Sequence, residues 1–329
     1  LFNRMDPPAK WASDLPILLK FAIKGHRRFS SHTPIVPLPK GLGNYARIST
    51  QRYLGDEMDK TYHFMAGLPR SGSTVLAALL NQNPQVYSSP QTDLVGMLYE
   101  LESKIPNYES YKAGLFYDGY LSVMKGVASN FYSKIDKPII IDKNRGWGTP
   151  YNFTELSPYV NPEGKVILTM RPILEVLASF VKVAKASQKV TNHLVYLNQN
   201  LWVSSYRDQT DAMVDNLMIP NGEIDRAIFS IANLLNNHRD RVYVVWFDDL
   251  TENPEQTMKG IYDFLGVDSC NHNFNNIKEV DKHDDLNAYG IVGLHDIKKK
   301  LAKPKTDPSE FLSEYVIQKY GNALDFLSF

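Results

Sequence analysis

One segment near residue 70 constrains the fold of this chain more than any other. Residues 62–66 form a short apolar run, and a loop from Gly67 to Gly72 separates this run from a helical segment that starts at Ser73. A strand, a tight loop and a helix in this order direct backbone N–H groups and a helix N-terminus toward an anion. The segment therefore predicts a strand–loop–helix unit with an anion site at the end of its strand.

The loop differs from a nucleotide triphosphatase loop at one decisive position. The spacing from Gly67 to Gly72 matches the Walker loop up to its second glycine, but Ser73 stands where that loop has Lys. The cation is Arg70 instead, inside the loop, and its planar fork suits two oxygens of one anionic group. Ser71, Ser73 and Thr74 add hydroxyl donors. The loop thus fits an anionic group without obviously fitting ATP with magnesium.

Strands and helices are expected to alternate from residue 60 onward. Short, nearly continuous apolar runs predict strands at residues 62–66, 138–141, 165–170 and 241–246. Helices are expected at residues 73–81, 111–132, 173–184, 224–236 and 254–265, with a last one through about 309–320. This alternation predicts an α/β fold, a three-layer sandwich around a central parallel sheet.

Polar residues follow three of the expected strands. The loop comes after Ala66, Asp142 and Lys143 come after Ile141, and Arg171 comes after Met170. Ligands of parallel sheets bind at the carboxyl ends of the strands, so these residues should meet at one edge. Ser179 lies on the helix expected behind Arg171, which suggests a ligand with two separated anionic groups.

The segment that ends at Lys143 supports two interpretations. An apolar strand ending in Asp142 resembles a Walker B acid, which would hold magnesium for a P-loop kinase of a small molecule. Alternatively, Lys143 is a catalytic cation and no metal is needed.

Composition excludes some classes of function and favours a location. The chain has 329 residues, 43% of them hydrophobic, and a formal net charge of +0, which gives no bulk argument for a nucleic-acid partner. Cys270 is the single cysteine, so an intrachain disulfide is impossible and a cytoplasmic location is expected. The histidines show no metal-binding spacing, and no apolar run is long enough for stable membrane insertion.

Residues 1–57 differ from the rest and are expected to form an N-terminal extension to a domain at 58–329. Six prolines and one short helical stretch, residues 17–24, characterise them. They either wrap over the surface of the main domain or form a basic amphipathic segment that touches a membrane or a partner. The chain begins at Leu1, which leaves open whether a segment precedes it.

Taken together, these motifs resemble those of sulfotransferases that use 3′-phosphoadenosine 5′-phosphosulfate (PAPS). The run from Gly67 to Thr74 is similar to the family's 5′-phosphosulfate loop, in the form of bacterial-type members and protein-tyrosine sulfotransferases. Arg171 and Ser179 match the spacing of the 3′-phosphate motif. Residues 247–250 resemble the family's Tyr-Glu-Asp-Leu segment, and residues 276–300, with Gly293-Leu294-His295, resemble the closing segment. The resemblance covers about residues 60–300.

The resemblance implies roles for particular residues. Lys143 would help to stabilise the transition state, together with Arg70. The 5′-phosphosulfate would be held by residues of the loop: Arg70, Ser71, Gly72, Ser73 and Thr74. The 3′-phosphate would be held by Arg171 and Ser179.

The chain departs from the family's pattern at two positions. Pro172 stands where an Asp often follows the Arg of the 3′-site, and Gln91 stands where related members place a glutamate base. Asp93 is the nearest carboxylate and is the hypothetical general base, with His63 and His283 as alternatives.

The implied reaction is in-line transfer of a sulfuryl group from PAPS to a hydroxyl or amine acceptor, which leaves adenosine 3′,5′-bisphosphate and needs no metal. A sugar, lipid, peptide or other small molecule remains possible as the acceptor. The rivals are the kinase and a non-catalytic nucleotide-binding protein. A basic cluster is either a solvated helix face or a cover for the 3′-phosphate: Lys298, Lys299, Lys300, Lys303 and Lys305.

Overall fold

The computed structural model describes residues 60–185, 209–282, 284–289, 293–304 and 307–327. Contacts divide the chain into Leu1–Asp59 and Lys60–Phe329, and all the described residues belong to the second unit. The expected extension at 1–57, including its helical stretch at 17–24, therefore lies outside the described residues.

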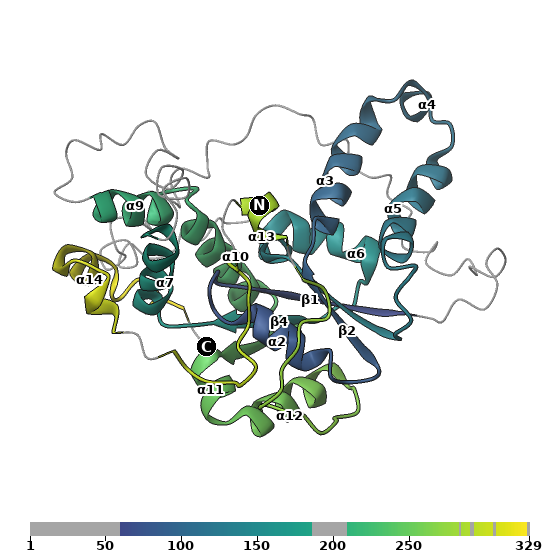
Figure 1. The fold of residues 1–329 in the computed structure, drawn as a ribbon. Helices are drawn as coiled ribbons and strands as arrows, with labels where there is room; N and C mark the ends of the chain where they lie inside the picture. The colour runs from purple at the N-terminus through teal and green to yellow at the C-terminus, as the bar shows by residue number, and fades with distance from the viewer. Residues whose placement is uncertain (1–59, 186–208, 283, 290–292, 305–306, 328–329) are drawn as a thin grey trace, which may run out of the picture. The chain divides into compact units, whose positions relative to one another are not determined.

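A five-stranded parallel sheet forms the centre of the fold, in the order β2-β3-β1-β4-β5 (Figure 1). Its strands are β1 (Thr61–Gly67), β2 (Val86–Gln91), β3 (Ile139–Lys143), β4 (Val166–Met170) and β5 (Val242–Trp246). β1 is central, with β3 on one side and β4 on the other. The chain crosses from one side of β1 to the other between β3 and β4, so a ligand is expected at the carboxyl end of β1.

Helices cover both faces of the sheet, which confirms the predicted three-layer α/β sandwich. On one face, Met65, Ile141 and Ile167 pack with α2 (Ser73–Leu80) and α12 (Pro254–Leu265) in one buried cluster. On the other face, Phe64 packs on Trp147 with ring centroids 4.4 Å apart, and α10 (Glu223–Asn237) contacts β1. Neighbouring residues of β1 thus pack into the cores on opposite faces of the sheet, because successive side chains of a strand point to opposite faces.

The edge strand β2 is the strand that the sequence did not predict. Its sequence, Val-Tyr-Ser-Ser-Pro-Gln, is largely polar and contains Pro90, and its register against β3 shifts between Ser88 and Gln91. Edge strands tolerate proline and polar residues because one side needs no ladder hydrogen bonds. An apolar-run criterion therefore overlooks such a strand.

Two of the expected helices require correction, and the described residues also form helices that the sequence did not predict. The single helix expected at 111–132 is divided into α4 (Glu109–Lys112) and α5 (Tyr117–Phe131), because Gly114 and Phe116 adopt positive φ angles between them. The expected last helix is a 3-10 turn, Pro308–Glu310, followed by α14 (Glu314–Tyr320). The other helices are α3 (Leu94–Lys104), α6 (Ser157–Val160), α7 (Ile173–Lys185), α9 (Gln209–Met218), α11 (Phe247–Glu252) and α13 (Asp285–Tyr289), with short helical turns at Ile105–Asn107, Arg145–Gly148, Asn152–Leu156 and Arg239–Arg241.

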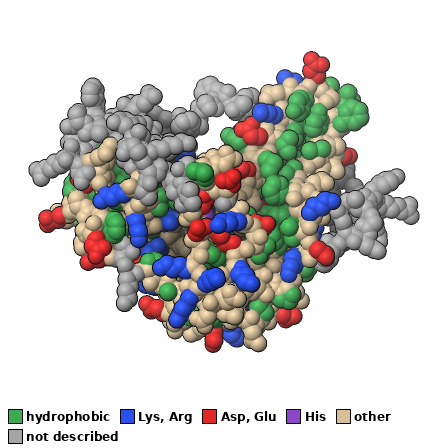
Figure 2. Space-filling view, in the orientation of Figure 1, with side chains coloured by type: hydrophobic (Ala, Val, Ile, Leu, Met, Phe, Trp, Pro, Cys, Tyr) green, Lys and Arg blue, Asp and Glu red, His purple; other side chains and the backbone are tan. Residues whose placement is uncertain are grey.

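The helices α3 and α5 contact each other and carry an apolar surface (Figure 2). Phe116, the residue before α5, is 76% exposed. Further large apolar side chains are exposed along the same helices and their connection, among them Tyr99, Tyr108, Leu115 and Val123. Exposed apolar residues gathered in this way are typical of a surface that meets another molecule.

Candidate functional site

The loop after β1 has a backbone that glycine makes possible. Gly67 has a φ of +129°, and a Cβ there would lie 2.1 Å from the backbone oxygen of Thr169 on β4. Gly72 has a φ of +86°, and a Cβ there would lie 2.3 Å from the Phe247 ring. Arg70, between them, also has a positive φ, of 61°, which is strained for a residue with a side chain. The loop is therefore tightly fixed against β4 and α11.

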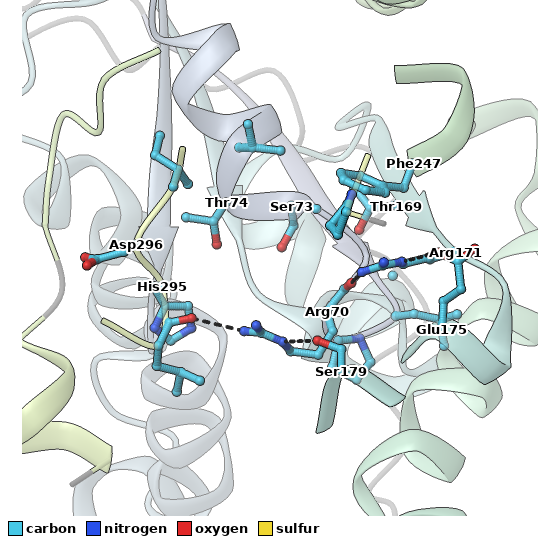
Figure 3. A pocket seen from close by; sticks show the side chains of 18 of the residues that line it. Arg70, Ser73, Thr74, Thr169, Arg171, Glu175, Ser179, Phe247, His295 and Asp296 are labelled. Carbon is cyan, nitrogen blue, oxygen red and sulfur yellow. Dashed lines mark hydrogen bonds and ion pairs between the residues drawn. The ribbon is translucent and has the colours of Figure 1, made fainter. Parts of the chain in front are cut away.

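A cavity of about 600 Å³ lies over this loop (Figure 3). Its walls come from the carboxyl ends of β1, β3 and β4, from α7 and from the chain segment 293–304. In Figure 3, Ser73 and Thr74 lie between His295 on one side and Arg171 with Glu175 on the other. The three cations expected at the strand ends, Arg70, Lys143 and Arg171, all line this one cavity.

Arg70 is held by α7 and by the segment 293–304. Its Nε donates a hydrogen bond to Ser179 Oγ at 3.1 Å, and its Nη1 donates to the backbone oxygen of Leu294 at 3.2 Å. Burial, and secondly the charge of Arg171, lower the pKa of Arg70 from its ordinary value, while Asp285 opposes this. An anion between the two guanidinium groups would relieve their repulsion.

Arg171 is buried directly after β4. Its Nε pairs with Glu175 Oε2 at 2.9 Å, and its Nη1 donates to the backbone oxygen of Arg70 at 3.1 Å. The guanidinium lies over the Phe247 ring, 5.0 Å from its centroid. Pro172 begins the turn into α7, since its backbone oxygen accepts from the N–H groups of Glu175 and Val176. Arg171 thus links the loop, α7 and α11.

Lys143 is the last residue of β3 and pairs in register with Met65 of β1 and Gln91 of β2. Its Nζ lies 3.4 Å from Thr74 Oγ1. Burial, followed by the charge of Arg145, lowers the pKa of Lys143 to about 8, and Glu279 opposes this shift. A cation held in such surroundings favours the arrival of an anion, which would restore its charged form.

Two predicted site residues are placed away from the cavity. Ser71 is buried, with its Oγ 2.5 Å from the backbone oxygen of Leu68 and 2.7 Å from Thr169 Oγ1, so its hydroxyl holds the loop together. Asp93 is exposed at the start of α3 and is not among the residues that line the cavity, whereas Gln91 is. Gly72, Ser73, Thr74 and Ser179 do line the cavity.

Asp142 is fully buried on the sheet and does not line the cavity. Its carboxylate accepts hydrogen bonds from Thr92 Oγ1 at 2.8 Å, Trp147 Nε1 at 2.6 Å and the Tyr132 hydroxyl. Burial raises the pKa of Asp142, and the three donors oppose this effect. The side chain therefore ties structural elements together and is not placed as a magnesium ligand.

Of the two histidines considered as alternative general bases, only His63 lies among the described residues. His63 is buried outside the cavity, its Nδ1 accepts from the Lys165 N–H at 3.2 Å, and burial lowers its pKa to about 4. His283 lies outside the described residues. His295, which the sequence did not single out as a site residue, lines the cavity and pairs with Asp285.

The basic cluster is not helical where it is described. Lys298 and Lys300 line the cavity, while Lys303 forms ion pairs with Asp248 at 2.7 Å and with Glu175 at 3.5 Å. Lys305 lies outside the described residues. The cluster thus contributes to a wall of the cavity next to the Arg171–Glu175 pair.

The described residues form neither a metal-binding cluster nor a membrane-spanning helix. They contain no group of three His, Cys, Asp or Glu side chains with the geometry of a metal site. Among the same residues, no helix is both long and apolar enough to cross a bilayer.

Comparison with models of known protein families identifies one family. A family model described as the sulfotransferase domain matches residues 60–326. Among solved structures, the sulfotransferase domain from the Synechococcus PCC 7002 olefin synthase is 18% identical with a TM-score of 0.45, and the match covers 84% of this chain and 98% of that one.

Two further solved structures are similar to a comparable degree. The sulfotransferase domain from the curacin biosynthetic pathway is 14% identical with a TM-score of 0.44, covering 82% of this chain and 93% of that one. Mouse sulfotransferase SULT7A1, complexed with PAP, is 12% identical with a TM-score of 0.44, covering 82% and 85%. No curated protein matches the chain.

Proposed function

The chain belongs to the sulfotransferase domain family, and on this basis we propose that it transfers a sulfuryl group from PAPS to a hydroxyl or amine acceptor, releasing adenosine 3′,5′-bisphosphate. One observation carries the choice of donor: three cations from three strand ends face one cavity beside a loop that ends in hydroxyl residues. Kinship with bacterial-type members and protein-tyrosine sulfotransferases is part of the proposal and rests on the loop Gly67–Thr74.

The loop side of the cavity suits the 5′-phosphosulfate. Ser73 and Thr74 offer hydroxyl donors at the start of α2, where the helix dipole also favours an anion. Gly72 allows the backbone to approach, and Ser71 shapes the loop through its internal hydrogen bonds. Lys143, in contact with Thr74, would face the same group.

The α7 side of the cavity suits the 3′-phosphate. Arg171 presents a guanidinium fixed by Glu175 and by the backbone of Arg70. Ser179 accepts a hydrogen bond from Arg70 and can donate its own proton to a phosphate oxygen. Lys298 and Lys300 add positive charge to the wall contributed by the segment 293–304.

Charge then explains how these residues would accelerate transfer. Negative charge grows on the bridging oxygen of the departing bisphosphate as the sulfuryl group leaves, and Arg70 and Lys143 are fixed where they can stabilise it. Positioning of donor and acceptor supplies much of the remaining acceleration. A sulfuryl group carries less charge than a terminal phosphoryl group, so side-chain cations are sufficient counter-charges.

The kinase alternative loses its main support at Asp142. A magnesium-holding acid must face the phosphates, but the carboxylate of Asp142 is enclosed by Thr92, Tyr132 and Trp147.

The division into an extension at 1–57 and a domain at 58–329 stays part of the proposal. The cytoplasmic location expected from the single Cys270 is also part of the proposal.

A thermal-shift comparison tests the proposed donor. Adenosine 3′,5′-bisphosphate at 100 times its Kd should stabilise the protein by about 2.7 kcal/mol without added metal, and ATP with magnesium should do little. Arg70→Ala should weaken bisphosphate binding by about 10- to 100-fold, because a charge-assisted contact contributes about 1.5–3 kcal/mol. Arg226→Ala is the matched control, since Arg226 is exposed and pairs with Glu223 outside the cavity.

Three outcomes would contradict the proposal. Equal stabilisation of wild type and Arg70→Ala by the bisphosphate would remove the assigned site. Stabilisation by ATP that depends on magnesium would favour the kinase, and bisphosphate binding without transfer would favour the non-catalytic protein. Incubation of candidate acceptors with labelled PAPS, followed by mass spectrometry, identifies the acceptor.

A further inference from the structure

Arg145 lines the cavity but takes no part in the proposed binding of the donor. It opens the helical turn Arg145–Gly148, two residues after the end of β3. Because β3 and β4 lie on opposite sides of β1, Arg145 and Arg171 follow strands on opposite sides of the loop. The 3′-phosphate is assigned to the Arg171 side. Arg145 therefore belongs to the part of the cavity away from that phosphate.

The turn that carries Arg145 is held by hydrogen bonds on both of its flanks. Before it, the Asn144 N–H donates to the backbone oxygen of Met65 at 3.1 Å, and Asn144 Oδ1 accepts from the Gly146 N–H at 2.7 Å. After it, Asn152 Nδ2 donates to the backbone oxygen of Gly146 at 2.7 Å. The backbone of Arg145 is thus fixed beside the carboxyl end of β1 before any ligand arrives.

The guanidinium of Arg145 is anchored at one nitrogen only. Its Nη2 pairs with Glu223 at the start of α10, while its Nε and Nη1 form no hydrogen bond with any of the described residues. Glu223 is shared, since its Oε2 pairs with Arg226 at 2.9 Å. One carboxylate thus serves two guanidinium groups, which leaves an excess positive charge. The side chain of Arg145 is 43% exposed, so its remaining N–H groups can bind a ligand.

Gln91 supplies a second available polar group at this end of the cavity. It is the last residue of β2, pairs in register with Lys143 of β3 and lines the cavity. Its side chain is partly buried and forms no hydrogen bond with the part of the chain that the structure describes. Arg145 is close enough to Lys143 for its charge to lower the pKa of that lysine. Gln91, Lys143 and Arg145 therefore border one region of the cavity.

We propose that the acceptor is a small molecule with an anionic group, a carboxylate or a phosphate, and that Arg145 binds this group. The inference rests on the proposed sulfotransferase function and narrows its acceptor. The planar guanidinium offers parallel N–H groups that match two oxygens of such an anion. Glu223 is the positioning residue, because it holds Nη2 and so orients the other two nitrogens.

This placement also orients the acceptor for transfer. Lys143 Nζ lies 3.4 Å from Thr74 Oγ1, and the sulfuryl group is assigned to this pair. An acceptor bound by its anion at Arg145 can direct its hydroxyl toward the sulfur, while the Gln91 amide hydrogen-bonds the same molecule. An ion pair as exposed as that of Arg145 and Glu223 adds little to stability, so stability alone does not account for it.

A binding assay with inorganic phosphate tests this anion site without knowledge of the natural acceptor. Full-length protein is saturated with adenosine 3′,5′-bisphosphate, which occupies the donor's phosphate positions, and its thermal stability is measured against phosphate at constant ionic strength. Phosphate should stabilise this complex. Arg145→Gln should weaken phosphate binding about 10- to 100-fold, and Arg145→Lys, which keeps the charge without the planar fork, should weaken it less. Arg226→Gln is the matched control, because Arg226 shares Glu223 but does not line the cavity.

Matched acceptors test the consequence for transfer. Each pair contains an anion and its neutral counterpart: lactate with lactamide, salicylate with salicylamide, and glycerol phosphate with glycerol. In every pair that accepts label from PAPS, kcat/KM should be at least about tenfold higher for the anion, and Arg145→Gln should remove this preference. The carboxylate and phosphate pairs show which of the two anions the site takes.

The outcomes distinguish this inference from the proposed function. Equal phosphate affinity of wild type and Arg145→Gln would overturn the role of Arg145, as would a bisphosphate-saturated wild type that phosphate does not stabilise. A neutral acceptor that reacts at least as fast as its anionic counterpart would overturn it too. The phosphate titration decides the question even if no acceptor pair reacts. Failure of the wild-type protein to bind the bisphosphate would instead overturn the proposed function itself.

Discussion

Replacing Lys143 by Met should make the ligand-free protein more stable, although Lys143 is proposed to act in transfer. Lys143 is 5% exposed, and burial lowers its pKa from 10.5 to about 8. A lowered pKa means that the folded protein disfavours the ammonium form relative to the unfolded chain. Met has a similar length and no charge, so the substitution removes this cost while filling the same space.

The magnitude follows from the two pKa values. A tenfold change in proton affinity corresponds to about 1.4 kcal/mol, so the interval from 10.5 to about 8 corresponds to about 3 kcal/mol. Below pH 8 both the folded and the unfolded chain carry the proton, and the variant has its full advantage. Between pH 8 and 10.5 the unfolded wild-type chain binds a proton that the folded chain lacks, so wild-type stability rises relative to the variant. Above pH 10.5 the advantage should be gone.

Urea unfolding of both proteins at a series of pH values from 7 to 11 measures this difference. Subtracting the two free energies of unfolding removes the contributions of tyrosines and other lysines, which titrate in both proteins. Lys259→Met is the control, because Lys259 is exposed on α12 and its substitution should show no such pH-dependent gain. A Lys143→Met protein that is no more stable at pH 7, or whose advantage is constant up to pH 11, would refute the reasoning.

Two further substitutions test the packing beneath the site. Gly67→Ala should lower the free energy of unfolding, measured in urea, by at least about 3 kcal/mol, because its Cβ would lie 2.1 Å from the backbone of Thr169 and its φ is positive. Gly96→Ala is the control on α3: nothing lies within 4 Å of its Cβ, so it should be neutral or stabilising. Asp142→Ala should cost about 3 kcal/mol or more by leaving the Trp147 N–H and two hydroxyls without an acceptor. Asp142→Asn should cost less, since its amide can still pair with them. Magnesium-dependent ligand binding in the wild-type protein that Asp142→Asn abolishes would contradict the structural role.

Much of the fold could be predicted because strands buried in a parallel sheet are visible in the sequence as short apolar runs. The runs that became β1, β3, β4 and β5 were recognised to within a few residues. β2 was missed because an edge strand can carry Ser and Pro where a central strand cannot. The break between α4 and α5 was missed because Gly114 is tolerated in a helical pattern and its positive φ is not visible from periodicity.

The site could be predicted where its residues follow directly from the ends of strands. Arg70, Lys143 and Arg171 each stand at the carboxyl end of a neighbouring strand, so topology alone brings them together. His295 could not be found in this way, because it lies in irregular chain whose path no periodic pattern fixes. Ser71 and Thr74 look alike as loop hydroxyls, and only tertiary packing shows that the first faces the loop interior.

The inward-facing carboxylate at the end of β3 has a consequence for the engineering of this scaffold. A lysine introduced at position 73 would recreate the cation of a triphosphatase loop, yet the acid needed to chelate a divalent ion would still be directed into the protein. Rotating Asp142 outward would release the segment after β2, the end of α5 and the turn after β3 from their shared acceptor. Conversion between the two nucleotide chemistries therefore requires several coordinated substitutions rather than a single codon change.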